Sequence, residues 1–171
     1  MADPATPDDL FAFLDSLGIE TNTVTHPALF TVEESRALRG DLPGGHTKNL
    51  FLKDKKGRLY LVTCDESRKI NLKALEKAIG SARVSFGKPE LLLETLGVTP
   101  GAVTTFCLIN DRGDAPRVTF AIDAALLQHD VIHCHPLHNE ATTAISSPDL
   151  MRFVEACGHQ AIKINFDELE A

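Results

Sequence analysis

Residues 44–54 place a lysine, Lys48, between a pair of glycines and an apolar run. The run Leu50-Phe51-Leu52 predicts a largely buried strand, which would hold Lys48 at its rim on a rigid element. Glycine backbone can approach a ligand closely because it carries no side chain. The segment therefore predicts an anion or substrate contact at Lys48. The alternative is a lysine that only extends its ammonium group into water from a strand end.

Four histidines, His129, His133, His135 and His138, fall within ten residues. Because His133 and His135 would face the same side of a strand, one interpretation is a zinc or iron site of the form His-x-His-x-x-His. Against this interpretation, no carboxylate at a useful spacing clearly completes the ligand shell, and Glu140 is the only local candidate. The alternative is a set of polar side chains at a strand end with ordinary hydrogen-bond partners.

Several other chemistries lack their motifs, since the sequence has neither a phosphate-binding glycine loop nor a Gly-x-Ser-x-Gly nucleophile motif. What remains is Lys48, the turn Pro100-Gly101-Ala102, and His135 with Asn139. Backbone N–H groups in a tight turn can hold a carbonyl oxygen as it becomes an oxyanion, and a lysine can hold a phosphate. This set suits hydrolysis of an activated acyl group by a positioned water molecule.

The charge distribution is uneven along the chain. The net charge is −7, yet residues 48–88 contain 11 Lys or Arg and four Asp or Glu, so the remainder of the chain is strongly acidic. A basic block on an acidic protein is typical of a selective contact with a polyanion such as RNA. The alternative is a solvated face with lysines at a hairpin tip.

Composition predicts an ordinary globular domain over residues 1–171, with a core over about 7–166. The chain is 43% hydrophobic and 24% charged, with no apolar run of the ~20 residues that would span a bilayer. The N-terminus has no basic or apolar signal segment. The four cysteines are widely spaced and form no Cys-x-x-Cys pair, which favours a reducing, cytoplasmic location over a disulfide framework; they are Cys64, Cys107, Cys134 and Cys157. They have no obvious activating base, which argues against a cysteine nucleophile.

The pattern of caps, periodicity and turns predicts single helices among many strands. Helices are expected to begin near Thr6, Thr31, Asn71, Pro89 and Ser147. Strands are expected over 21–25, 48–54, 58–64, 83–86, 103–109, 117–122, 131–135, 142–146 and 161–166. Hairpins are expected at 54–57 and 110–114. The fold class is therefore α+β, with a mixed sheet rather than a doubly wound parallel one.

Five short motifs stand together in the order of a known family. They are His26-Pro27-Ala28, Thr31-x-Glu33-Glu34, Lys48-Asn49-Leu50-Phe51-Leu52, Leu96-Gly97-Val98-x-Pro100-Gly101-Ala102-Val103-Thr104, and His135-Pro136-Leu137-x-Asn139-x-x-Thr142. On these motifs the chain resembles the YbaK/ProX superfamily, relatives of the editing domain of bacterial prolyl-tRNA synthetase. It looks most like the freestanding ProXp-ala (PrdX) branch.

The resemblance implies a YbaK-like fold, a mixed and largely antiparallel sheet or partly closed barrel with surrounding helices. It implies a cytoplasmic trans-editing enzyme that hydrolyses Ala-tRNA(Pro), with tRNA and prolyl-tRNA synthetase as partners and with no metal or cofactor. Lys48 matches the family's catalytic lysine. Substrate-binding positions would be Thr31, Asn49, Gly101, Ala102, Val103, His135 and Asn139. Contacts with RNA would come from Lys53, Lys55, Lys56, Arg68 and Lys69.

The sequence leaves three points of this interpretation open. Thr105-Phe106-Cys107 departs from the family pattern after the Gly101 turn, so Cys107 can alter the pocket and its amino-acid preference. A deacylase for Cys or Ser is therefore an alternative to one for Ala. A non-catalytic module that binds tRNA or a synthetase would use the same surface.

Overall fold

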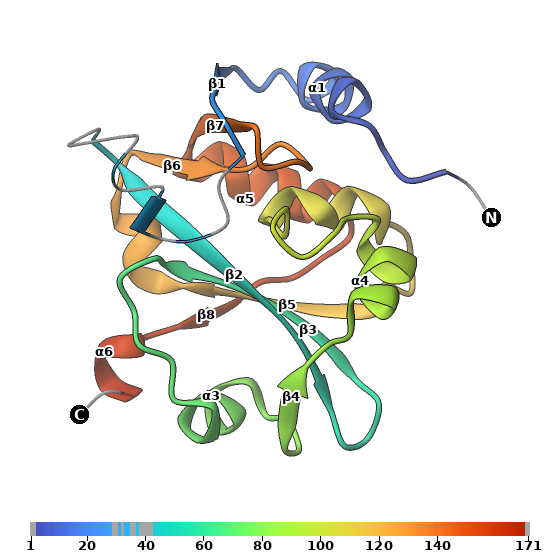
Figure 1. The fold of residues 1–171 in the computed structure, drawn as a ribbon, viewed down its shortest axis with the longest axis vertical. Helices are drawn as coiled ribbons and strands as arrows, with labels where there is room; N and C mark the ends of the chain where they lie inside the picture. The colour runs from blue at the N-terminus through green and yellow to red at the C-terminus, as the bar shows by residue number, and fades with distance from the viewer. Residues whose placement is uncertain (1–2, 29–30, 32, 35–36, 38–42, 170–171) are drawn as a thin grey trace.

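The computed structural model describes residues 3–28, 31, 33–34, 37 and 43–169. In this part of the chain, helices lie on both faces of one mixed sheet of eight strands (Figure 1). The elements are α1 (Pro7–Ser16), β1 (Thr21–Thr25), β2 (Gly45–Asp54), β3 (Leu59–Asp65), α3 (Leu72–Ile79), β4 (Val84–Phe86), α4 (Pro89–Leu96), η1 (Thr105–Asn110), β5 (Val118–Asp123), η2 (Ala124–Gln128), β6 (Val131–Cys134), β7 (Ala141–Ser146), α5 (Ser147–Ala156), β8 (Ile162–Ile164) and α6 (Phe166–Leu169).

Local signals set most helix ends as the sequence predicts. Thr6 and Asp9 form a reciprocal capping box at the start of α1. The Asn71 side chain caps α3, and Gly80 and Gly97 end α3 and α4 in the left-handed conformation. At Thr31 the hydroxyl accepts a hydrogen bond from the Glu34 N–H at 3.0 Å, but most of the helix expected there lies outside the described residues.

Strand β2 joins the two parts of the sheet and has a gap in its pairing. It pairs with β3 over residues 47–53, with β6 at Gly45 and His46, and with β4 from Leu52 to Asp54. On the side of β4 and β6, no strand of the described chain pairs with residues 47–51. Because backbone polar groups on an unpaired edge are free to bind a ligand, this gap is a natural place for a site.

The prediction of a strand over residues 103–109 is wrong. Its hairpin with 117–122 does not form, because residues 105–110 form the 3-10 helix η1, whose residues 105–109 are all buried. An apolar run of this length fits a buried helix as well as a strand. β5 instead pairs in parallel with β3 and β8, so the second hairpin is absent from the described chain.

The α+β class and mixed sheet are confirmed, with four antiparallel and three parallel strand pairings in the described chain. The sheet is open, because its path begins at β1 and ends at β8 rather than closing. Strand β3 is buried on both faces: Leu59 and Leu61 pack in the cluster that includes α1, α4, η1 and α5, whereas Tyr60 and Val62 pack against α3. None of the described helices is long and apolar enough to cross a membrane.

Candidate active site

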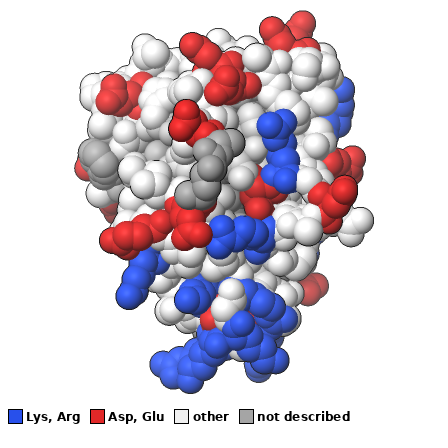
Figure 2. Space-filling model, turned by 90° about the vertical axis from the view of Figure 1, so that its right-hand side faces the viewer, with Lys and Arg blue, Asp and Glu red and all other residues white. Residues whose placement is uncertain are grey.

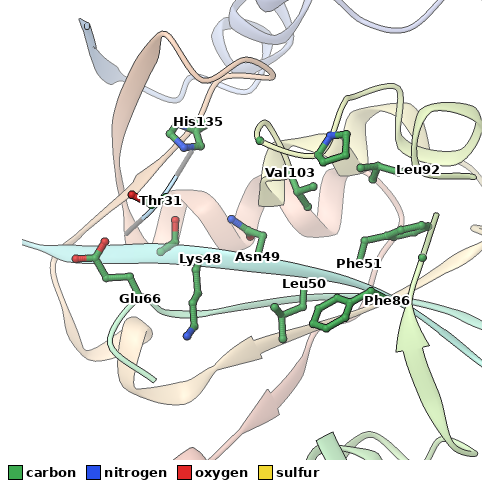
Figure 3. A pocket seen from close by; sticks show the side chains of 14 residues that line it. Thr31, Lys48, Asn49, Leu50, Phe51, Glu66, Phe86, Leu92, Val103 and His135 are labelled. Carbon is green, nitrogen blue, oxygen red and sulfur yellow. The ribbon is translucent and has the colours of Figure 1, made fainter. Parts of the chain in front are cut away.

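A cleft of about 540 Å³ lies at the gap in the pairing of β2 (Figure 3). It brings together six of the eight positions predicted as catalytic or substrate-binding: Thr31, Lys48, Asn49, Gly101, Val103 and His135. Three further lining residues, Leu50, Phe51 and Pro100, belong to the sequence motifs around Lys48 and Gly101. The sequence did not single out the other lining residues as part of a site; they are Thr47, Glu66, Phe86, Gly87 and Leu92. Ala102 is buried, and Asn139, in the loop between β6 and β7, does not line the cleft.

The cleft wraps around the unpaired edge of β2, so its two halves lie on opposite faces of the strand. Successive side chains of a strand alternate between faces. Lys48 and Leu50 accordingly point to one face, whereas Asn49 and Phe51 point to the other, toward Val103 and the turn (Figure 3). We call these the lysine face and the asparagine face.

On the lysine face, the Lys48 ammonium donates a hydrogen bond to the backbone carbonyl of Arg68. An ammonium group has three N–H donors, so this bond fixes its direction and leaves further donors for a ligand. Arg68 is itself held: its guanidinium donates to Asp167 at 2.7 Å and to the buried Asp123 at 3.0 Å, which raises the pKa of Arg68 above its usual value. The Arg68 side chain is only 12% exposed. These contacts hold Arg68 in place, and with it the backbone carbonyl that accepts the hydrogen bond from Lys48.

On the asparagine face, a chain of hydroxyl groups orients Asn49. Thr63 Oγ1 lies 2.6 Å from Asn49 Oδ1 and 2.8 Å from Thr105 Oγ1. Because a carbonyl oxygen can only accept, Thr63 uses its single hydroxyl proton on Asn49 and must accept from Thr105. The Asn49 oxygen is thereby occupied, and its NH₂ group, on the cleft side in Figure 3, is the half that remains to donate to a ligand.

The turn at Gly101 is present, but one of its amides is already used. The Ala102 N–H donates to the Thr99 carbonyl at 3.0 Å and closes the turn. Among the described residues, the Gly101 and Val103 N–H groups donate no hydrogen bond, so they are the amides left for a carbonyl oxygen. Cys107 lies beneath the turn, fully buried, with its thiol directed at the Ala102 carbonyl at 3.9 Å.

The cysteines are unsuited to nucleophilic attack, because only a thiolate is a good nucleophile. Burial raises the pKa of all four thiols to about 12. Cys107 does not line the cleft either, so it affects the pocket only by supporting the turn.

His135 forms the far wall of the asparagine face. Its Nδ1 lies 3.1 Å from the Ala141 carbonyl and therefore donates, so that Nε2 is the acceptor of the neutral ring. Burial lowers the pKa of His135 despite the hydrogen bond to Ala141, and the nearby His26 and His138 lower it further. The imidazole is consequently neutral at pH 7 and offers a hydrogen-bond acceptor to the cleft.

The remaining histidines have other partners. His133 Nε2 lies 2.9 Å from the Pro43 carbonyl and its ring stacks on His46 at 4.5 Å, while His138 Nδ1 accepts from the Glu140 N–H. Within the described ranges, no three His, Cys, Asp or Glu side chains are grouped as metal ligands.

The two glycines before Lys48 allow close packing of neighbouring residues and do not bring the backbone close to a ligand. Gly44 has φ of +119°, and a Cβ there would lie 2.8 Å from His133 Nε2. Gly45 is buried against Leu126 and His129. The glycines therefore let β2 and β6 come together, which begins the gap that forms the cleft.

A basic surface adjoins the cleft at the tip of the β2–β3 hairpin, the end where Lys and Arg gather in Figure 2. A second hollow of about 770 Å³ there is lined by the basic residues Lys53, Lys55, Arg83 and Lys88 and by the acidic residues Glu90 and Glu94 of α4. Lys56 is exposed in the hairpin turn. Lys69, before α3, is exposed but lines neither hollow.

Asp54 shapes this hairpin. Burial alone would raise the pKa of Asp54, but N–H donors from Arg58 and Ala82 and the Arg58 guanidinium outweigh it and hold the pKa at about 2. The carboxylate also accepts from the Lys56 N–H at 3.0 Å. The fully ionised Asp54 thus fixes the turn that displays Lys55 and Lys56.

Comparison with known proteins agrees with this geometry. The model of the aminoacyl-tRNA editing domain matches residues 26–153. The chain belongs to this family. It is 43% identical over 159 residues to the mouse prolyl-tRNA synthetase associated domain-containing protein 1, covering 90% of this chain and 92% of that protein. It is 37% identical over 151 residues to the prolyl-tRNA editing protein ProX of Acetoanaerobium sticklandii, covering 88% and 91%.

The editing-domain fold is also found by structure. A crystal structure provisionally described as a trans-editing enzyme for prolyl tRNA synthetase superposes with a TM-score of 0.68 at 19% identity, covering 94% of this chain and 98% of that one. At this identity the likeness shows the fold alone. The family membership places the chain in the YbaK/ProX superfamily, as the motifs predicted.

Proposed function

We propose that this protein is a trans-editing deacylase that hydrolyses Ala-tRNA(Pro) to alanine and tRNA. One observation carries the proposal: the unpaired edge of β2 has a cation on one face and hydrogen-bonding groups beside a small apolar wall on the other. An aminoacyl ester at the end of an RNA has two matching parts: an anionic RNA terminus, which a cation can bind, and an aminoacyl group, which hydrogen-bonding groups and an apolar wall can bind. The names of two relatives, a prolyl-tRNA editing protein and a prolyl-tRNA synthetase associated domain-containing protein, support an editing reaction on tRNA(Pro).

The chemistry is ester hydrolysis, in which a water oxygen attacks the aminoacyl carbonyl and the ribose oxygen leaves with a proton. The Asn49 NH₂ group and the Gly101 and Val103 amides would stabilise the negative charge that develops on the carbonyl oxygen. Lys48 would hold the RNA terminus through its phosphate and ribose oxygens. Neutral His135 would accept a hydrogen bond from the alanine ammonium group through Nε2, which orients the ester between the two faces.

The asparagine face would select the amino acid by size. Phe51, Leu92 and Val103 bring apolar side chains to this half of the cleft. Such a wall admits a methyl group and can exclude a larger ring by steric clash, although it discriminates weakly among side chains of similar size. We therefore expect Ala to be hydrolysed faster than Pro, with Ser and Cys as the nearest competitors.

The basic surface would supply affinity for the acceptor end of the tRNA. Prolyl-tRNA synthetase would be a partner from which the protein receives the charged tRNA. Lys53, Lys55 and Lys56 are exposed at the hairpin and can contact phosphates. Arg68 and Lys69 stay predictions as RNA contacts, since the Arg68 side chain is engaged by Asp123 and Asp167.

The test is a deacylation panel with tRNA(Pro) charged with Ala, Ser, Cys or Pro. We expect the protein to accelerate loss of Ala at least about tenfold over the spontaneous rate and to leave Pro intact. A faster rate for Ser or Cys than for Ala would assign a different amino acid to the same reaction. Tight binding of all charged tRNAs with no acceleration would show a binding module and would contradict the proposal.

A further inference from the structure

Phe86 is an exposed aromatic residue at the junction of the cleft and the basic hollow. It is 62% exposed, the most exposed of the large hydrophobic side chains in the described part of the chain. Phe86 and its neighbour Gly87 line both hollows. Because it lies where the two hollows meet, this ring can contact a ligand that occupies either of them.

The sheet register fixes the face on which this ring lies. Phe86 pairs directly opposite Leu52 of β2. Because alternate residues of a strand share a face, Phe86 lies on the same face as Leu52, Leu50 and Lys48. Figure 3 shows its ring beside Leu50, on the side to which Lys48 points. Lys48, Leu50 and Phe86 therefore form a row on the lysine face.

Gly87 anchors Phe86 at this place. The Gly87 N–H donates to the Phe51 carbonyl at 2.9 Å, and a Cβ on Gly87 would lie 2.3 Å from the Phe51 ring. No side chain fits in that space, so the backbone of β4 is held tightly against β2. The Phe86 ring is thus presented from a fixed support, as a stacking surface requires.

We propose that Phe86 is the platform on which the unpaired 3′-terminal base of the charged tRNA stacks. This inference rests on the proposed function. An aromatic ring between cations is the usual way to bind single-stranded nucleic acid, because every base has a face to stack and every phosphate needs a positive charge. Here Lys48 lies on one side of Phe86, and Lys53, Arg83 and Lys88 line the hollow on the other. The terminal base would cover Phe86 and Leu50 while the preceding phosphates follow the basic hollow.

The direct test is the fluorescence of 2-aminopurine placed as the terminal base of an uncharged acceptor-stem RNA, since stacking quenches it. Binding to the protein should give quenching at the terminal position that disappears in Phe86→Ala and Phe86→Leu and persists in Phe86→Trp. Phe86→Leu keeps apolar surface but removes the aromatic face. Leu93→Ala, which removes another exposed apolar side chain on α4, should behave as the unmodified protein does.

Hydrolysis gives the second readout. Loss of stacking should raise KM for Ala-tRNA about 5- to 150-fold in Phe86→Ala. Replacing the terminal base by an abasic site should lower the rate for the unmodified protein by a similar factor and have little further effect on Phe86→Ala.

The outcomes separate base stacking from deacylation. If the protein hydrolyses Ala-tRNA but Phe86→Ala changes neither the quenching nor KM by more than about twofold, the terminal base does not stack on Phe86. The proposal of a deacylase is then unaffected. If the protein hydrolyses no aminoacyl-tRNA but the quenching depends on Phe86, the deacylase is wrong and base stacking stands. If Phe86→Ala weakens binding to prolyl-tRNA synthetase and leaves RNA binding unchanged, Phe86 is a protein contact and the inference is overturned.

Discussion

The two faces of β2 differ in what they can bind, although their residues alternate along the same strand. The lysine face presents an ammonium group fixed by the Arg68 carbonyl, next to an exposed aromatic ring and a basic hollow. The asparagine face presents an oriented amide, turn N–H groups and a neutral histidine among apolar side chains. A strand with an unpaired edge can therefore hold the two halves of one substrate and leave the bond between them accessible to water.

The largest effect is expected on the lysine face. Lys48→Ala should lower kcat/KM for Ala-tRNA by on the order of 10²-fold or more, because the variant has no charge to hold the RNA terminus at the edge. Single-turnover deacylation measures this. Lys48→Arg keeps the charge but changes its geometry and should fall in between. Rates equal to those of the unmodified protein would remove Lys48 from its role.

The asparagine face should respond to size. Val103→Phe fills the space proposed for the alanine methyl group and should lower kcat/KM about 5- to 150-fold, as overpacking typically costs. Affinity for uncharged tRNA, measured by fluorescence anisotropy, should stay within about twofold. A variant that binds RNA more weakly but keeps its rate at saturation would show that the two faces are not separate.

The third prediction concerns His135 and pH. The lowered pKa of His135 predicts that kcat/KM stays high down to about pH 6.5 and falls only at more acidic pH, when Nε2 is protonated and no longer accepts. His135→Gln should be slower by about tenfold and lose this acidic limb. An acidic limb that the substitution leaves in place would assign it to another group.

The same shift affects stability. A histidine whose pKa is lower in the folded state favours folding at pH values above its unfolded pKa, about 6.5, and this contribution is lost as the pH falls toward the folded value. In urea unfolding, His135→Gln should therefore show a weaker decline in stability below about pH 6.5. An unchanged decline would mean that His135 is not buried in its neutral form.

The smallest effect is expected from the hairpin lysines. Lys55→Ala with Lys56→Ala should weaken RNA binding a few-fold at low salt and reduce the slope of log K against log salt by about 0.7–0.9 for each phosphate that the variant no longer neutralises. Lys73→Ala with Lys77→Ala, on the exposed side of α3, removes the same charge as a control. Equal weakening in both pairs would indicate net charge rather than a specific surface.

The sequence predicts the parts of the site that depend on local pattern. The motifs place Lys48, Asn49, the Gly101 turn and His135 in one site, and the alternation of residues 48–51 is enough to divide that site into two faces. It does not predict the gap in the sheet, because the strands that bound the gap, β4 and β6, pair with β2 from positions far along the chain. For this reason the sequence does not reveal Phe86 and Gly87 as site residues.

Charge and periodicity along the sequence do not show which partners the tertiary structure gives a residue. Arg68 belongs to the basic block, but its partner Asp123 lies 55 residues away and buries most of its side chain. The apolar run at residues 105–109 fits a strand or a buried helix, and full burial within the domain selects the 3-10 helix that supplies Thr105 to the Asn49 network. The ion pair of Arg68 and the 3-10 helix both depend on contacts between residues far apart in the sequence, which local pattern does not show.

The most direct test is a crystal structure of the protein with an acceptor-end RNA that carries alanine through a non-hydrolysable amide. We predict that the alanine methyl group contacts Val103 on the asparagine face, that the amide oxygen lies within hydrogen-bond distance of the Asn49 NH₂ group, and that the RNA terminus contacts Lys48 on the other side of the β2 edge. Alanine and RNA bound together on one face, with the edge of β2 uncovered, would contradict the two-faced site.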